Sequence, residues 1–264
     1  MRELKDILAE VQANIANACA KAHRDPSEVE IIAVTKTHGP EVVREAWENG
    51  LSIVGENKVQ EAAWKKPESV SGPEWHLIGH LQRNKVRHAL GLFECFHSVD
   101  SIALLDRIDS IADELGARPR VLLEVNVSGE QSKSGMRPQD VDAAVERALS
   151  LKRVTLEGFM TMAPFTPKPE ETRPHFARLR ELRDDMEKRF GVVLPRLSMG
   201  MTNDYAVAIE EGATWVRLGT VLFGERPKTK PARLVDASDA GESGEGGGLY
   251  DRVLDKPAQN RCFP

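Results

Sequence analysis

Residues 31–36 read IIAVTK, a short apolar run that ends on a lysine. A run this brief cannot make a helix, and it is typical of a buried parallel β-strand. Barrels and open sheets place their chemistry at the carboxyl ends of such strands, which is where Lys36 falls. Burial disfavours an ammonium, and a neutral amine can condense with an aldehyde to form a Schiff base. Lys36 is therefore a candidate nucleophile, and the alternative is a surface lysine that keeps its charge in water.

The pattern of a strand followed by a helix recurs along the chain. After Lys36, Pro40 starts and Gly50 ends a helical segment, and later helical segments separate most of the strand-like runs. These runs, eight with the first, are 51–57 (LSIVGEN), 75–79 (WHLIG), 96–100 (FHSVD), 121–127 (VLLEVNV), 156–162 (LEGFMTM), 196–201 (RLSMGM) and 215–220 (WVRLGT). Apolar strands that alternate with helices indicate parallel βαβ units. We expect an α/β fold, a single (β/α)8 TIM barrel, with a doubly wound open sheet as the alternative.

The two ends of the chain differ from this repeat. Residues 3–22 carry apolar side chains at helical spacing and predict an extra amphipathic N-terminal helix. Residues 227–264 are rich in Gly, Pro, Ser and charge, with few apolar side chains to offset the cost of ordering. We expect a barrel domain over 1–226 and a disordered, low-complexity tail over 227–264.

Composition excludes several classes of protein. The 36 basic and 41 acidic side chains give a net charge of −5 with no concentrated positive region, which argues against nucleic acid as a partner. No apolar run approaches the ~18 residues that span a bilayer, and the charged amino terminus lacks a signal core. The three cysteines form no CxxC pair, so neither a disulfide framework nor a metal site is indicated. We expect a cytoplasmic protein that does not bind membranes.

The carboxyl ends of the predicted strands carry small and polar residues. In a barrel these ends share one mouth, where Lys36 would face the loops after the last two strands. The segments LSMGMTND and RLGT combine hydroxyls with glycines beside helix starts. This combination is typical of a phosphate site. The alternative is that the glycines only make tight turns. Pyridoxal 5′-phosphate (PLP) carries both an aldehyde and a phosphate. The strand ends and loops at this mouth carry the candidate residues for binding it, which are Lys36, Asn57, Ser198, Met201, Arg217, Gly219 and Thr220.

Several motifs together resemble a known family. AVTK, GEN with VQE, WHLIGHLQRNK, HSVDS, NVSGEQSKSGM, GFMTM, LSMGMTND and VRLGTVLFG occur in the order and spacing of the pyridoxal phosphate homeostasis proteins, relatives of the barrel domain of bacterial alanine racemases. The resemblance covers roughly residues 3–226. Thr202 departs from it, because the family usually has a serine there, and the tail from Pro227 is longer than in the family.

The resemblance also implies roles for single residues. Lys36 would hold PLP covalently, Ser198, Gly219 and Thr220 would contact its phosphate, and Asn57 would lie near the cofactor. Arg217 aligns with the racemase arginine that faces the pyridine nitrogen. An arginine stays protonated, so it disfavours a second positive charge on the ring and makes the ring a weaker electron sink.

The same residues favour a binding protein over an enzyme. Racemisation needs a second acid or base opposite the lysine, which the racemases supply as a tyrosine coupled to an additional domain. Here Tyr205 and Tyr250 are the only tyrosines, and neither is an obvious second base. We expect a monomeric PLP carrier that serves PLP-dependent apo-enzymes and maintains vitamin B6 and amino-acid homeostasis. The alternatives are a PLP-dependent amino-acid racemase or lyase and, less favoured, a phosphosugar-type barrel enzyme.

Other residues have more ordinary interpretations. His76 and His97 lie within apolar runs and are expected to be hydrogen-bonded core histidines. Cys95 is expected to be a small buried hydrophobe, and Met160 and Met162 to pack in the core, with contact to the cofactor ring as the alternative. His80 and Lys133 could reach the mouth, where Lys133 is a hypothetical phosphate contact.

Overall fold

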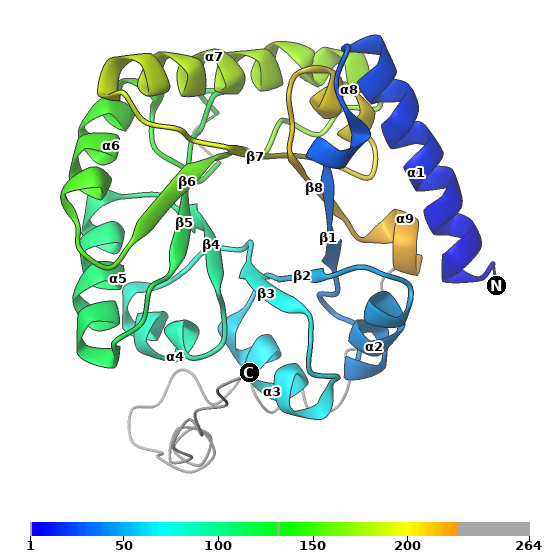
Figure 1. The fold of residues 1–264 in the computed structure, drawn as a ribbon, viewed down its shortest axis with the longest axis horizontal. Coiled ribbons are helices and arrows are strands. Elements are labelled where there is room, and N and C mark those ends of the chain that lie inside the picture. Colours follow the sequence, from blue (N-terminus) through cyan, green and yellow to red (C-terminus); the bar gives the residue numbers. More distant parts are fainter. Residues whose placement is uncertain (1, 131–132, 226–264) are drawn as a thin grey trace, which may run out of the picture.

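The computed structural model describes residues 2–130 and 133–225 and forms a closed barrel of eight strands. Consecutive strands pair in parallel around the ring, and β8 closes it against β1. Figure 1 shows the helices arranged outside this ring. The predicted barrel is confirmed, and the open-sheet alternative is wrong because the first and last strands are hydrogen-bonded to each other. The predicted tail, 227–264, lies outside the described residues.

The strands are short, as expected for a barrel of this size. Their bounds are β1 Glu30–Val34, β2 Ile53–Glu56, β3 Glu74–Leu77, β4 Cys95–Val99, β5 Arg120–Glu124, β6 Thr155–Met160, β7 Arg196–Met201 and β8 Trp215–Leu218. The first strand ends two residues before Lys36, which lies in the following turn. The lysine therefore sits beyond the sheet and above the barrel wall.

A helix follows each strand, and one more precedes the barrel. Their bounds are α1 Leu4–Lys21, α2 Pro40–Glu48, α3 Val59–Glu68, α4 Val86–Leu90, α5 Ile102–Leu115, α6 Val141–Ser150, α7 Arg173–Phe190, α8 Tyr205–Glu210 and α9 Thr220–Phe223. Pro40 occupies the first turn of α2, where a missing N–H costs nothing. Ser101 caps α5 by accepting a hydrogen bond from Leu104 N–H at 3.3 Å.

The predicted N-terminal helix is confirmed, and it packs against α8. Its buried face comprises Leu4, Leu8, Val11, Ile15, Ala18 and Cys19, at the spacing of one helical stripe. Asn14 donates to the Tyr205 hydroxyl at 3.1 Å, and Lys21 pairs with Glu210 at 3.0 Å. Figure 1 shows α1 running along the outside of the barrel beside α8 and α9.

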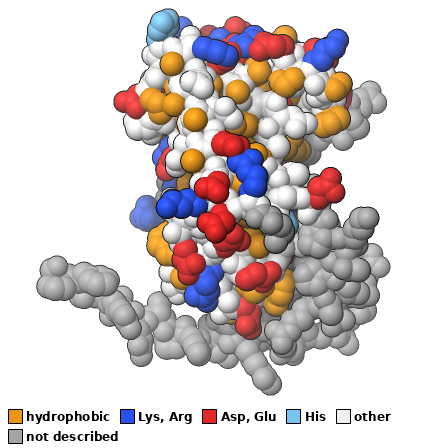
Figure 2. Space-filling model, turned by 90° about the vertical axis from the view of Figure 1, so that its right-hand side faces the viewer, with side chains coloured by type: hydrophobic (Ala, Val, Ile, Leu, Met, Phe, Trp, Pro, Cys, Tyr) orange, Lys and Arg blue, Asp and Glu red, His pale blue; other side chains and the backbone are white. Residues whose placement is uncertain are grey.

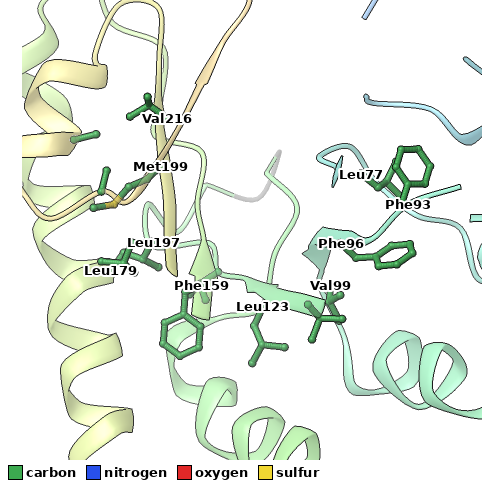
Figure 3. Packing of buried hydrophobic residues seen from close by; sticks show 14 of the residues in the cluster. Leu77, Phe93, Phe96, Val99, Leu123, Phe159, Leu179, Leu197, Met199 and Val216 are labelled. Carbon is green, nitrogen blue, oxygen red and sulfur yellow. The ribbon is translucent and has the colours of Figure 1, made fainter. Parts of the chain in front are cut away.

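The alternation of side chains along each strand divides the core into two parts. Outward residues such as Phe96, Phe159 and Leu197 pack under the helices in one large cluster (Figure 3). Inward residues fill the barrel with a smaller cluster of Ile32, Ile53, Cys95, Leu122, Met160 and Trp215, against which Met162 packs. The expected core roles of Cys95 and Met160 are confirmed.

The outer surface is mixed in charge on the face that carries α1. Figure 2 shows acidic and basic side chains interspersed there, with apolar side chains scattered among them. Within residues 2–130 and 133–225, no helix is both long enough and apolar enough to span a bilayer.

Candidate cofactor site

Four neighbouring strands of the barrel carry the predicted cofactor-binding residues. In the order β7, β8, β1, β2, each strand is hydrogen-bonded to the next. Ala33 is level with Leu218, and Val34 is level with Gly55. The loop that carries Lys36 therefore leaves the barrel between the ends of β8 and β2. The structure brings the segments that hold Lys36, Asn57 and Gly219 to one side of the mouth.

A buried cluster of charges holds the backbone on both sides of Lys36. The Nζ of Lys65 on α3 donates 2.7 Å hydrogen bonds to the Thr35 carbonyl and to the Oε1 atoms of Glu56 and Glu61. The Thr35 hydroxyl donates to Glu56 at 2.6 Å, and the Thr37 N–H donates to Glu61. Thr35 is thus hydrogen-bonded to Lys65 and Glu56, and Thr37 to Glu61, so one connected cluster holds both neighbours of Lys36. We name Glu56, Glu61 and Lys65 the buried triad.

The buried triad is almost fully removed from water. Lys65 and Glu56 are 0% exposed, and Glu61 is 4% exposed. Burial raises the pKa of the Glu56 carboxyl to about 7, although the Lys65 ammonium beside it favours the ionised form. Sequence reasoning missed this triad. Its only signal was the spacing of Glu61 and Lys65, four residues apart on a helix, which usually indicates an exposed pair.

Arg217 lies inside the barrel and is fixed by the opposite wall. Its Nη1 donates to both the carbonyl and the Oγ of Ser198 at 2.7 Å, and its Nη2 donates to the Thr161 carbonyl at 2.9 Å. Burial lowers its pKa to about 10, so the guanidinium stays charged at neutral pH. Three of its five N–H groups are committed to the barrel wall.

Ser198 is placed differently from the sequence-based expectation. It is 0% exposed, in the middle of β7, and its hydroxyl contacts Arg217 and His97 rather than the open mouth. The reason is the alternation along β7, which turns Ser198 into the barrel below the loop. Its hydroxyl is hydrogen-bonded to Arg217 and His97, and its contact with a phosphate stays a prediction.

The loops after β7 and β8 meet at the rim. Thr202 accepts a 3.4 Å hydrogen bond from the Val221 N–H, which joins the two loops. A Cβ on Gly219 would lie 3.2 Å from the Val34 carbonyl oxygen, so glycine lets the start of α9 approach the end of β1. Thr220 and Met201 are exposed beside this contact. Thr202 is not among the predicted site residues, but its hydroxyl lies at the rim, whereas that of Ser198 lies inside the barrel.

The remaining candidates lie elsewhere around the rim. Asn57 follows β2 directly and is half-buried. His80 pairs with Asp100 at 3.2 Å across the ends of β3 and β4. Lys133 lines a cavity of about 450 Å³ beyond β5, on the far side of the ring from Lys36. Its contact with phosphate stays a hypothesis.

His76 and His97 are buried, hydrogen-bonded core residues, as expected. Their rings join through His76 Nδ1 and His97 Nε2 at 2.9 Å, and His97 stacks on Trp215 with ring centroids 5.1 Å apart. Cys95 lies close enough to suggest a three-residue metal site. However, two nitrogens bound to one tetrahedral zinc lie about 3.4 Å apart, so these nitrogens are placed for a hydrogen bond instead.

Burial strongly disfavours a charge on either imidazole. It lowers the pKa of His76 to about 4 and that of His97 well below its usual value, and in His97 the charge of Arg217 adds to the effect. The charged groups that act on His76 from neighbouring strands and loops are Glu30, Glu74, Glu94, Glu157, Arg120 and Arg196.

Acidification is therefore expected to destabilise the fold through His76. Between its folded pKa near 4 and an unfolded value near 6.5, the unfolded chain binds a proton that the folded chain does not. Lowering the pH from 7 to 5 should reduce the free energy of unfolding by about 2 kcal/mol through this residue. Urea unfolding of the wild type and His76→Gln at both pH values measures the difference. An equal pH dependence in the two proteins would contradict the assignment.

These features fit PLP. The lysine just beyond a barrel strand suits the aldehyde of PLP. The glycine, at a position where a Cβ would crowd the neighbouring strand, leaves room for the phosphate. The buried guanidinium suits the pyridine nitrogen. Lys36, Gly219, Thr220, Thr202 and Arg217 are the residues that would hold it.

Comparison with known proteins identifies the family. The sequence model described as "Alanine racemase, N-terminal domain" matches residues 7–227. A pyridoxal phosphate homeostasis protein of Aquifex aeolicus is 45% identical over 221 residues, which are 83% of this chain and 96% of that protein. This chain belongs to the pyridoxal phosphate homeostasis protein family. The resemblance in the sequence motifs is confirmed.

Solved structures of relatives agree with this assignment. PipY of Synechococcus elongatus PCC7942, solved with PLP bound, is 38% identical with a TM-score of 0.74, and the match covers 84% of this chain and 100% of PipY. An alanine racemase of Clostridium difficile 630 shares only 17% identity but the same fold, with a TM-score of 0.67. That match covers 86% of this chain and 58% of the racemase. This pyridoxal phosphate homeostasis protein thus matches just over half of the length of the racemase.

Proposed function

We propose that this chain binds PLP through Lys36 and stores it or hands it on to PLP-dependent apo-enzymes, and so maintains vitamin B6 and amino-acid homeostasis. Membership of the pyridoxal phosphate homeostasis family and the PLP-bound PipY structure support the proposal. The single observation that carries it is the turn around Lys36, because Thr35 and Thr37 are both fixed by the buried triad. A lysine on a backbone turn fixed in this way at the rim of a barrel is suited to form one specific covalent link.

Each part of the site has a distinct task. Bound PLP supplies an aldehyde that condenses with the Lys36 amine, with formation of a C=N bond and release of water. Gly219 leaves room beside β1, and the backbone and hydroxyls of Thr220 and Thr202 bind the phosphate. Met201 is exposed at the same rim, and its N–H donates to Asp204 at 2.7 Å, which shapes the loop after β7. Asn57 flanks the lysine from β2.

Arg217 limits what the bound cofactor can do. If Arg217 faces the pyridine nitrogen of PLP, its guanidinium would disfavour a proton on that nitrogen, since a second positive charge would be repelled. The ring would then be a weak electron sink, which handicaps reactions at the α-carbon of an amino acid. This supports a carrier rather than a racemase.

The position of Tyr205 supports the same conclusion. Its hydroxyl accepts a hydrogen bond from Asn14 of α1, on the outside of the barrel, and the residue is 7% exposed. It is not placed to move a proton at the mouth. Tyr250 lies outside the described residues. We further propose that the protein is a monomer and acts in the cytoplasm, where its buried Cys19 and Cys95 stay reduced.

Turnover by PLP-loaded protein distinguishes a carrier from an enzyme. We expect the wild type to form a borohydride-reducible adduct with PLP, to pass PLP to an added apo-enzyme, and to show no sustained conversion of D- or L-amino acids. Absorbance, mass mapping and chiral chromatography measure these three results. Sustained conversion that disappears in Lys36→Ala would replace the carrier with a racemase or lyase.

A further inference from the structure

A chain of hydrogen bonds crosses the interior of the barrel and ends on Arg217. Glu74 Oε1 lies 3.0 Å from His76 Nε2, and His76 Nδ1 lies 2.9 Å from His97 Nε2. His97 Nδ1 lies 2.8 Å from the Ser198 hydroxyl, which also contacts Arg217 Nη1 at 2.7 Å. These residues come from β3, β4, β7 and β8. Glu74 also lines a cavity of about 640 Å³ at the amino ends of the strands, opposite the mouth.

The Glu74 carboxylate, which can only accept, sets the direction of the hydrogen bonds in this chain, and the Arg217 end is compatible with that direction. Arg217 can only donate, so the Ser198 oxygen accepts from it and the Ser198 hydroxyl proton is available to His97 Nδ1. His97 then carries its proton on Nε2 and donates to His76 Nδ1. His76 likewise carries its proton on Nε2 and donates to the Glu74 carboxylate. The opposite direction would place an unprotonated nitrogen of His76 against that carboxylate.

Two groups approach His76 Nε2, and the carboxylate is the nearer. Glu74 Oε1 lies 3.0 Å from this nitrogen, whereas Arg120, which can only donate and forms an ion pair with Glu74, lies 3.5 Å away, at the outer limit of a hydrogen bond. Both imidazoles lie against the Trp215 ring, with centroids 4.9 and 5.1 Å away. Ring packing and satisfied nitrogens hold the pair neutral inside the barrel.

We propose that His76 and His97 are positioning residues that orient Arg217 toward the cofactor. The hydrogen bonds from Ser198 through His97 and His76 to Glu74 all run in one direction, and we call them the relay. The relay fixes the orientation of the Ser198 hydroxyl that accepts a hydrogen bond from the Arg217 guanidinium. The Ser198 hydroxyl proton is directed away from Arg217, so its lone pairs face the guanidinium. This inference rests on the proposed PLP site and adds two residues that do not touch the cofactor themselves.

The tautomers of the PLP-free full-length protein test the relay directly. Nitrogen-15 NMR at pH 7 is expected to show His76 and His97 as neutral imidazoles, each protonated at Nε2. An Nδ1-protonated tautomer or an imidazolium at either position would overturn the relay. Because this measurement needs only the folded wild type, it gives an answer whether or not PLP binds.

Two substitutions of His97 test the effect on the cofactor. His97→Asn retains an acceptor near the Nδ1 position and should bind PLP nearly as the wild type does. His97→Gln retains only the Nε2 position and is expected to bind PLP about tenfold more weakly, with an altered pH titration of the cofactor absorbance. Cys95→Ala is the matched control, because Cys95 is buried in the same barrel interior on the same strand but lies outside the relay.

The outcomes separate this inference from the proposed function. If the wild type binds PLP and His97→Gln matches it in affinity and titration, the relay does not position Arg217. If Cys95→Ala weakens binding as much as His97→Gln, packing rather than the relay is responsible and the inference fails. A wild type that does not bind PLP would refute the proposed function, while the tautomers would still report on the relay.

Discussion

Lys36→Ala is expected to abolish the covalent attachment of PLP. Borohydride treatment should leave no adduct, the absorbance band of the wild-type complex should be missing, and PLP affinity should fall on the order of 100-fold, equivalent to about 2.8 kcal/mol. The physical reason is that, without the amine, only the contacts proposed for the phosphate and the ring would remain. Equilibrium dialysis and mass mapping of the reduced protein measure the effect.

The fold should survive this substitution. The buried triad contacts the Thr35 side chain and the backbone of Thr35 and Thr37, and these groups are unchanged in Lys36→Ala. Lys58→Ala is the matched control, since Lys58 is an exposed lysine near the end of the neighbouring strand β2. It should retain the adduct and the absorbance band. A reduced adduct mapped to any other lysine, or a band that persists in Lys36→Ala, would contradict the assignment of Lys36.

Lys65→Met is expected to destabilise the protein by about 3–5 kcal/mol. The substitution leaves Glu56 and Glu61 buried without the ammonium that donates to both at 2.7 Å. One carboxylate must then take up a proton or stay charged in a dry environment, and either costs free energy of folding. Urea unfolding at pH 7 measures the loss.

The neighbouring lysine provides the control for Lys65. Lys66 is on the same helix, but its side chain is 30% exposed and its Nζ pairs with Glu94 at 2.9 Å near the surface. Lys66→Met should cost less than about 1 kcal/mol. Adding Glu56→Gln and Glu61→Gln to Lys65→Met should restore part of the stability, because no uncompensated charge remains. Equal losses in Lys65→Met and Lys66→Met would show that the triad contributes no more than a surface pair.

The buried triad also links stability to function. Weakening it releases Thr35 and Thr37, which flank Lys36. Lys65→Met should therefore also lower the yield of the PLP adduct, even under conditions in which the protein is fully folded.

The sequence by itself determined the barrel fold and the position of Lys36 just after its first strand. Apolar runs such as 31–36 and 121–127, each followed by a helical segment, can be satisfied only by buried parallel strands covered by helices. Since the carboxyl ends of such strands converge, Lys36 and the loop at Gly219 could be assigned to one mouth before the structure was known. The local signal at Pro40 also agreed with the helix observed, which begins there.

Only the tertiary structure decided which polar residues face inward and what they contact. Ser198 looked like a phosphate ligand from its motif, but its register on β7 turns it toward Arg217 and His97. No motif singled out Lys65, yet α3 places its ammonium against the Thr35 carbonyl beside Lys36. Contacts of this kind join residues from distant segments, and their energies depend on burial that no local pattern specifies.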